Sequence, residues 1–268
     1  MADQPRVLLD IQDNIAIVTL NRADKYNGLD WAMFSGIVST VKTLKKNKTV
    51  RAVILRGDGK VFSSGLDVMS MKKDPLFIPK LLIKPGTKIS NVAQDVSYLW
   101  RELPIPVIAV THGKCYGGGL QIAMGADFRF STPDCEFSIL EAKWGLIPDM
   151  AGMLAWREVL RGDVLRDLTY TGRMVQAEEA KQIGLISRIE EDPMQAALDY
   201  AQELAARSPD SVGASKLLIN RIWAASDKGV LNWETKLQKK VLGRWNQLAA
   251  ASKNTSKTPK EYKQRKIK

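Results

Sequence analysis

The chain has 268 residues, of which 45% are hydrophobic, and it carries a formal net charge of +11 at pH 7 with a pI near 9.6. This length and apolar content can build one large domain, alone or with a small appendage. The single histidine, His112, excludes a multi-histidine metal site and argues against a Ser-His-Asp hydrolase. We therefore expect no metal centre and look for a general base among the carboxylates.

The cysteines and the first residues indicate the cellular compartment in which the protein is expected to act. Cys115 and Cys135 are too few for a disulfide framework and lack metal-site spacing, so we interpret them as reduced thiols. The segment 1–5 lacks a basic start followed by an apolar stretch, and no run reaches the roughly 18 apolar residues of a membrane span. These features predict a soluble, cytoplasmic protein without membrane insertion.

The N-terminal half alternates strand and helix signals. Apolar runs at 7–12 and 15–20 flank Asp13-Asn14, which predicts a β-hairpin. Asp30 can cap a helix whose apolar residues recur every three or four positions until 45–48, and 52–56 reads as a strand.

The next segment changes character twice. From 69 to 86 the sequence loses periodicity and contains three prolines, so we expect a mobile loop. A helix is predicted at 87–101, and a strand follows at 107–110. After Pro148 the periodicity and the Gly and Pro positions predict a run of helices, at 151–161, 163–170, 176–183, 193–207, 210–226 and 230–250.

Two glycine-bearing segments about fifty residues apart are the most informative feature of the chain. Phe62-Ser63-Ser64-Gly65-Leu66-Asp67 follows one strand-like run, and His112-Gly113-Lys114-Cys115-Tyr116-Gly117-Gly118-Gly119-Leu120-Gln121 follows another. Each can free a backbone N–H from ladder or helix pairing. Two such donors that converge on one carbonyl oxygen would stabilise a developing negative charge, and a helix after the triplet would add its dipole.

The order of these motifs resembles the crotonase superfamily of enoyl-CoA hydratases and isomerases. The similarity includes the stretch 20–29, both glycine segments, Ala126-Asp127-Phe128-Arg129, Glu141 with the turn 145–148, and the stretch 171–186. It covers about residues 6 to 250. The resemblance implies an α/β spiral of ββα units at 1–200, a helical trimerisation region at 201–252, and a basic tail at 253–268, which we expect to be flexible.

The resemblance also implies the site. The ligand would be an acyl-CoA thioester, with no cofactor apart from the coenzyme A of the substrate, and the assembly a homotrimer or a dimer of trimers. The N–H groups of Leu66 and Gly118 match the oxyanion-hole donors of the family. Further residues match the segments that bind substrate and coenzyme A: Arg22, Lys25, Ser64, Gly65, Asp67, Gly117 and Gln121.

Two carboxylates are candidates for proton transfer. Glu141 matches the glutamate that hydratases and dienoyl-CoA isomerases of the family use near the α carbon. Asp149 falls where dienoyl-CoA isomerases have a second catalytic acid, although it could instead cap a helix that begins near residue 150.

Gln121 departs from both subfamilies. Hydratases have a second glutamate here and dienoyl-CoA isomerases an aspartate, whereas a glutamine keeps hydrogen bonds but cannot act as an acid or base. We therefore expect an enoyl- or dienoyl-CoA double-bond isomerase, with an enoyl-CoA hydratase as the alternative. A non-catalytic protein that binds acyl-CoA or RNA is the third possibility.

The positive charge has three interpretations. Lysines gather at 42–48, at 80–88 and in the tail from 253 to 268. They could form a solvated surface, attract the phosphates of coenzyme A, or bind nucleic acid. No aromatic-interleaved basic motif of the kind that stacks bases is visible, which disfavours the last.

Overall fold

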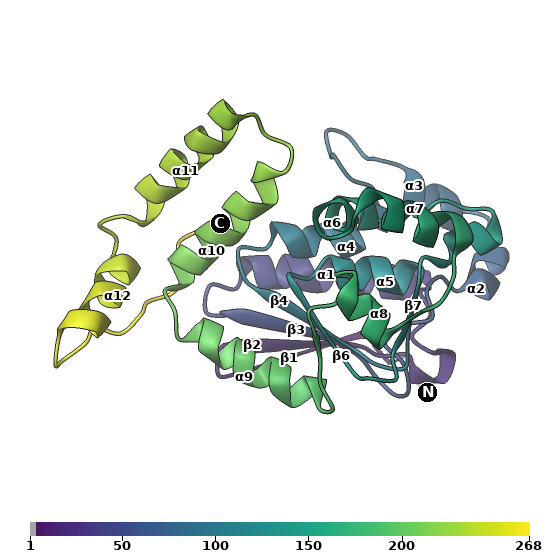
Figure 1. The fold of residues 1–268 in the computed structure, drawn as a ribbon, viewed down its shortest axis with the longest axis horizontal. Helices are drawn as coiled ribbons and strands as arrows, with labels where there is room; N and C mark the ends of the chain where they lie inside the picture. Colours follow the sequence, from purple (N-terminus) through teal and green to yellow (C-terminus); the bar gives the residue numbers. More distant parts are fainter. Residues whose placement is uncertain (1–3) are drawn as a thin grey trace.

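A computed structural model describes residues 4–268 (Figure 1). Residues 1–3, on which the expected cytoplasmic location partly depends, lie outside the described residues. The described chain forms a six-stranded sheet in the order β1-β2-β3-β4-β6-β9 and a three-stranded sheet in the order β5-β7-β8. Helices cover both faces of the larger sheet, which gives the expected mixed α/β architecture.

The chain begins with the predicted hairpin. β1 (Val7–Gln12) and β2 (Ile15–Leu20) pair antiparallel, and Asp13 and Asn14 form the turn with φ of 49° and 66°. Aspartate and asparagine tolerate this left-handed conformation better than most residues, so the turn fixes the register of the two strands.

The remaining strands of the large sheet run parallel to β2 and to one another. They are β3 (Ala52–Gly57), β4 (Val107–Thr111), β6 (Phe128–Ser131) and β9 (Arg188–Ile189). β3 and β4 are apolar almost throughout because both of their faces are buried.

Each face of this sheet has its own helical cover. α1 (Trp31–Lys46), α4 (Val92–Glu102) and α5 (Gly118–Met124) pack with side chains such as Val53 and Leu55 in the main core. α9 (Pro193–Ala205) places Ala197 and Ala201 on the opposite face. Asp30 caps α1 as predicted, since its side chain accepts a 2.8 Å hydrogen bond from the Met33 N–H.

The small sheet positions the second glycine segment. β5 (Lys114–Tyr116) pairs parallel with β7 (Glu136–Ser138), which pairs antiparallel with β8 (Val175–Gln176). A 3-10 helix, η2 (Leu140–Trp144), follows β7, and another, η1 (Ala23–Lys25), follows the opening hairpin. β5 thus ends two residues before α5 begins, and β7 leads into η2, which contains Glu141.

The prediction of a loop at 69–86 is wrong for most of that segment. The chain forms α2 (Val68–Lys73) and α3 (Phe77–Leu82), and the predicted helix at 87–101 begins only at Val92, after an Asn91 capping box. Phe77 is buried in an edge-to-face contact with Phe34 of α1. Tertiary burial of Phe77, together with Leu81, therefore orders a segment without helical periodicity.

The helical region after Pro148 is largely as predicted. It contains α6 (Gly152–Val159), α7 (Gly162–Thr171), α8 (Ala177–Gln182), α10 (Pro209–Ile222), α11 (Asp227–Val241) and α12 (Trp245–Thr255). The prediction of a single helix at 230–250 is wrong, because Gly243 adopts φ of 72° and separates α11 from α12. A boundary at residue 200 would also cut α9, which packs on the sheet as far as Ala201.

The C-terminal tail packs against the protein, which contradicts the flexible arm expected from 253. α12 continues to Thr255, and Ile267 is buried at 4% exposure. The Asp210 carboxylate accepts hydrogen bonds from the N–H groups of Lys266 and Ile267, and the Arg265 N–H donates to the Lys48 carbonyl. A low-hydrophobicity sequence therefore docks through backbone hydrogen bonds together with the buried Ile267 side chain.

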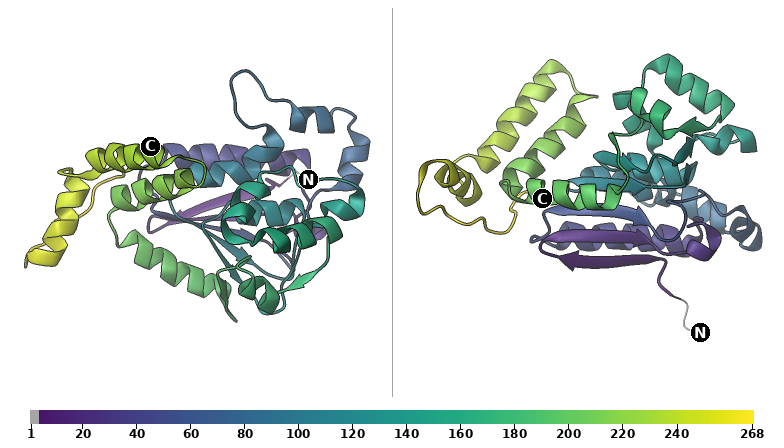
Figure 2. Two further views of the ribbon diagram at one scale, coloured as in Figure 1. Left: turned by 45° about the horizontal axis from the view of Figure 1, so that its top comes forward. Right: turned by 60° about the horizontal axis from the view of Figure 1, so that its bottom comes forward.

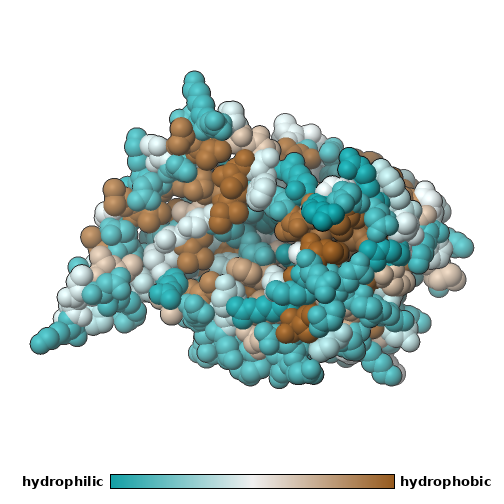
Figure 3. All heavy atoms as spheres, in the orientation of Figure 1, coloured by the Kyte–Doolittle hydropathy of each residue, from teal (hydrophilic) through white to brown (hydrophobic). Residues whose placement is uncertain are grey.

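α10, α11 and α12 project from the rest of the molecule (Figures 1 and 2). Between them and the core lies a cavity of about 990 Å³, lined by residues that include Glu158, Lys216 and Gln247. Apolar surface is exposed over these C-terminal helices (Figure 3). The exposed large apolar residues in or directly after these helices include Ile219, Trp223, Leu231, Leu242, Trp245 and Leu248. No helix within residues 4–268 has both the length and the apolar character that crossing a membrane requires.

Candidate active site

The structure brings the two glycine segments together. Ser63 pairs with Cys115 in a parallel bridge, and the Ser63 carbonyl accepts a 3.0 Å hydrogen bond from the Tyr116 N–H. A Cβ added to Gly65 would lie 2.9 Å from the Tyr116 carbonyl oxygen and 3.4 Å from the Gly118 nitrogen. Gly65 therefore lies directly against the backbone of the second segment, and its φ of 87° also favours glycine.

Two backbone donors are free at this junction. The Leu29 N–H donates to Gly65, and the Asp67 N–H donates to Leu29, so the intervening Leu66 N–H points away from Leu29. Gly118 is the first residue of α5, where N–H groups have no partner within the helix. Neither the Leu66 nor the Gly118 N–H has an acceptor among residues 4–268.

Steric constraints explain the glycines of the triplet. Gly117 adopts φ of 48° and is the N-cap of α5. A Cβ on Gly118 would lie 2.7 Å from the sulfur of Met150 and 2.9 Å from a methyl carbon of Leu29, while one on Gly119 would lie 2.6 Å from the Ser63 side chain. The triplet lets α5 begin in close contact with three neighbouring segments.

Glu141 lies beside this junction. A Cβ on Gly117 would be 3.6 Å from Glu141 Oε1, which places the carboxyl next to the residue that precedes Gly118. Glu141 Oε2 is buried and has no hydrogen-bond partner in the described part of the chain. Burial raises the pKa of Glu141, and the Asp149 charge raises it further, against hydrogen bonds from its own N–H and from Gln121.

Gln121 is fully buried and connects three segments. Its Nε2 donates to Glu141 Oε1 at 2.6 Å, and its Oε1 accepts from the N–H groups of Met150 and Gly152 at 2.8 and 3.1 Å. The sequence indicated a polar residue here but gave no sign of its contacts with the backbone at 150–152.

Asp149 lies at the rim of the site. Its side chain is largely solvent-exposed, yet the surrounding protein is dense enough that desolvation raises the pKa of its carboxyl. The alternative role as a helix cap is not observed, because the N-cap of α6 is Ala151. The structure thus brings Asp149 close enough to Glu141 for their charges to interact.

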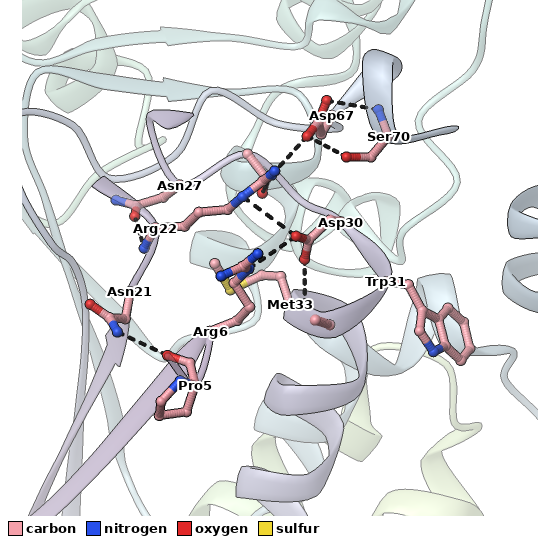
Figure 4. Close-up of polar contacts among 12 residues, drawn as sticks. Pro5, Arg6, Asn21, Arg22, Asn27, Asp30, Trp31, Met33, Asp67 and Ser70 are labelled. Atoms are coloured by element: carbon pink, nitrogen blue, oxygen red, sulfur yellow. Dashed lines mark hydrogen bonds and ion pairs between the residues drawn. The ribbon is translucent and has the colours of Figure 1, made fainter. Parts of the chain in front are cut away.

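Arg22 and Asp67 are engaged with protein groups (Figure 4). Arg22 Nη1 donates to the Gly28 carbonyl and to Asp67 Oδ2, both at 2.8 Å, and its Nε lies 3.4 Å from Asp30. Burial alone would raise the pKa of Asp67, but hydrogen bonds from Ser70 and Arg22 outweigh it and lower the pKa to about 2. These side chains tie the first glycine segment to the stretch 22–30.

Of the other residues expected to bind substrate, Lys25 lies in the chain next to a residue that contacts Ser64 of the first glycine segment. The Ser64 N–H donates to the Tyr26 carbonyl at 2.9 Å, next to Lys25 in the chain. Lys25 is exposed, so its ammonium is accessible to an anionic ligand.

The surroundings of His112 and Cys115 favour a packing role over a catalytic one. His112 Nε2 lies 3.0 Å from the Gly59 carbonyl oxygen, and burial lowers the pKa of its imidazole. Burial raises the pKa of the Cys115 thiol well above its usual range, which disfavours the nucleophilic thiolate.

The positive charge is concentrated in the C-terminal helices and tail. Residues 236–268 contain eleven lysines and arginines and one acidic residue, Glu261, so this segment carries +10 of the formal +11. The rest of the chain is nearly neutral. Attraction of anions to the glycine segments would therefore depend on local side chains such as Lys25.

Comparisons with known proteins agree with this architecture. The family model for enoyl-CoA hydratase/isomerase matches residues 10–265. The chain is 31% identical over 220 residues to the mitochondrial Delta(3,5)-Delta(2,4)-dienoyl-CoA isomerase of Rattus norvegicus, covering 77% of this chain and 65% of that protein, just under two thirds of its length. It is 29% identical over 218 residues to the short-chain-enoyl-CoA hydratase of Clostridium acetobutylicum, covering 80% and 81%.

A solved structure shows the same fold. The enoyl-CoA hydratase of Bacillus anthracis superimposes with a TM-score of 0.86 at 22% identity, covering 96% of this chain and 99% of that one. The sheet order and the paired glycine segments define a crotonase-type α/β protein. The chain belongs to the enoyl-CoA hydratase/isomerase family.

Proposed function

We propose that this protein is an enoyl- or dienoyl-CoA double-bond isomerase. The observation that carries the proposal is the set of groups around Glu141: a second carboxyl, Asp149, lies near it, and the uncharged Gln121 occupies the position of a second acid. A glutamine cannot accept a proton from water, whereas two carboxyls can move a proton along an acyl chain.

The free N–H groups of Leu66 and Gly118 are the proposed oxyanion hole. Two donors directed at a thioester oxygen stabilise the negative charge that gathers there when a carbon of the acyl chain loses a proton. The substrate is an acyl-CoA thioester, and its phosphates can pair with exposed basic groups such as Lys25.

The environments of the two carboxyls assign their roles. Asp149, at the solvent-exposed rim, takes a proton from a distal carbon, and the resulting dienolate places its charge on the thioester oxygen. Glu141, the more buried of the two and with an Oε2 that has no hydrogen-bond partner among residues 4–268, returns a proton to the α carbon. The net result is a shifted double bond, with no water added.

Hydration is the second candidate, supported by the similarity to a bacterial short-chain-enoyl-CoA hydratase. Absorbance spectra with enoyl-CoA and dienoyl-CoA substrates test the proposal, because isomerisation changes conjugation while hydration removes the enone band. We expect isomerisation to dominate. Hydration alone, or binding without a spectral change as in a non-catalytic acyl-CoA or RNA binder, would overturn the assignment.

We also propose a homotrimer or a dimer of trimers. α10 to α12 carry exposed apolar side chains and lie over a cavity. In a monomer this apolar surface would stay in contact with water. A cytoplasmic site of action is part of the same proposal.

A further inference from the structure

The orientation of the Gln121 side-chain amide is fixed by the backbone. Two N–H groups, those of Met150 and Gly152, point at one end of the amide, and a backbone N–H can only donate. That end must therefore be the carbonyl oxygen. The NH₂ end consequently faces Glu141 Oε1, at 2.6 Å.

This orientation makes the two oxygens of Glu141 unequal. Oε1 must accept a hydrogen bond from the Gln121 NH₂ group, which cannot accept one in return. A carboxyl hydroxyl is a poorer acceptor than a carboxyl carbonyl, so the proton of neutral Glu141 is favoured on Oε2. Oε2 is also the oxygen that is buried without a hydrogen-bond partner in residues 4–268. A charged oxygen without a partner costs more there than a neutral hydroxyl, whose proton can be donated to a bound ligand.

We propose that Gln121 is a positioning residue that makes Oε2 the proton-carrying atom of Glu141 and holds Asp149 in register with it. The inference rests on the isomerisation proposed above. Gln121 itself exchanges no proton. It fixes Glu141 through its Nε2 and fixes the backbone that follows Asp149 through its Oε1.

Protons and electrons balance over the cycle. Asp149 begins as a carboxylate and forms an O–H bond with the proton of the distal carbon, whose C–H electron pair enters the dienolate. The dienolate then forms a new C–H bond at the α carbon with the proton from Glu141 Oε2, and the O–H electron pair stays on Glu141. Proton exchange with solvent afterwards restores the neutral Glu141 and the ionised Asp149.

The variant Gln121→Glu separates this role from simple anchoring. While both carboxyls are protonated at low pH, the introduced carboxyl can donate to Oε1 and accept from the two N–H groups, as glutamine does, and Glu141 keeps its proton on Oε2. The pair loses its first proton at a lower pH than Glu141 alone, because the two facing oxygens then share the proton that remains, and Oε2 has none to donate. We expect near wild-type turnover at low pH and a loss of about 100-fold at higher pH, where the wild type keeps its activity.

The variant Gln121→Leu removes both contacts and provides the matched control. It should lose about 100-fold in turnover at every pH while binding of an unreactive acyl-CoA analogue changes little. Asp149 is the other charged group that acts on Glu141. Its contribution is common to the wild type and both variants, so the difference between their pH profiles isolates position 121.

Simple anchoring predicts a different outcome. A carboxylate at 121 can still accept from Met150 and Gly152, so a Gln121→Glu profile that overlays the wild type at all pH values would overturn the inference. Infrared titration of the carboxyl band that Glu141→Gln removes provides a readout without turnover: Gln121→Glu should split the loss of this band into two steps, one below and one above the wild-type pH, and an unchanged titration would also overturn the inference. If the wild type shows no isomerase activity, the proposed function fails, while this titration still decides the contact.

Discussion

Gly65 lies against the backbone of Tyr116, two residues before Gly118: a Cβ on Gly65 would lie 2.9 Å from the Tyr116 carbonyl oxygen and 3.4 Å from the Gly118 nitrogen. Gly65→Ala should therefore push apart the two proposed oxyanion donors and lower kcat by about 100-fold or more. Gly243→Ala is the control, because Gly243 has a similar positive φ but no atom within 4 Å of an added Cβ. Both variants carry the left-handed strain. Equal turnover in the two would contradict the placement of the oxyanion hole at this contact.

Exposed basic side chains near the glycine segments, such as Lys25, predict how acyl-CoA affinity depends on salt. Binding should weaken as ionic strength rises, because salt screens the coenzyme A phosphates from exposed basic groups. Lys25→Ala should reduce both the affinity and its salt dependence, whereas Lys45→Ala, an exposed lysine on α1, should change neither. Calorimetry at low and high salt measures this. Absence of binding by any acyl-CoA at low ionic strength would reject the family's ligand class for this chain.

Much of the fold could be predicted from local signals. The Asp13-Asn14 turn, the Asp30 cap and the apolar run of β4 each determine their element through nearby residues. Where the prediction failed, distant contacts decided the structure. Phe77 orders α3 by packing on Phe34, and Asp210 binds the backbone of the tail from more than fifty residues away.

The candidate site shows the same division. Glycine at 65 and 118 and the carboxyls at 141 and 149 could be identified from their motifs. The three contacts of Gln121 could not, because they join residues about twenty to thirty positions apart and depend on how η2 and the segment after it fold over α5. Arg22 stays a predicted coenzyme A residue, and its side chain donates hydrogen bonds to Gly28 and Asp67.

The exposed apolar face of the C-terminal helices predicts self-association. Sedimentation at micromolar concentration should show a trimer or a hexamer. Leu242→Glu, at a position 61% exposed on this face, should weaken the assembly by burying a charge. Leu8→Glu, 43% exposed on β1, is the control and should leave the assembly unchanged. A stable wild-type monomer would count against the trimer.

The raised pKa of Glu141 predicts a pH-dependent effect on stability. Because the folded pKa lies above the ordinary value of 4.5, folding favours the neutral form, and the stability from this group is lost as pH rises from 4.5 through the folded pKa. Glu141→Gln removes that loss. The free energy of unfolding of the variant, relative to wild type, should therefore be more favourable at neutral pH than near pH 4. Denaturant titrations at both pH values measure the difference, and a constant difference would show that Glu141 ionises as it does in the unfolded chain.

The relay between Glu141 and Asp149 can be tested directly. Glu141→Gln and Asp149→Asn should each lower isomerase turnover by about 100-fold or more, since each removes a group that must gain or lose a proton, while the affinity for an unreactive acyl-CoA stays nearly unchanged. In a hydratase, by contrast, Asp149→Asn should be almost silent and Gln121→Glu should raise hydration. Measuring both reactions for the three variants distinguishes the two mechanisms. If Asp149→Asn retained full isomerisation, Asp149 would not be the base, and the proton would have to be moved by Glu141 alone.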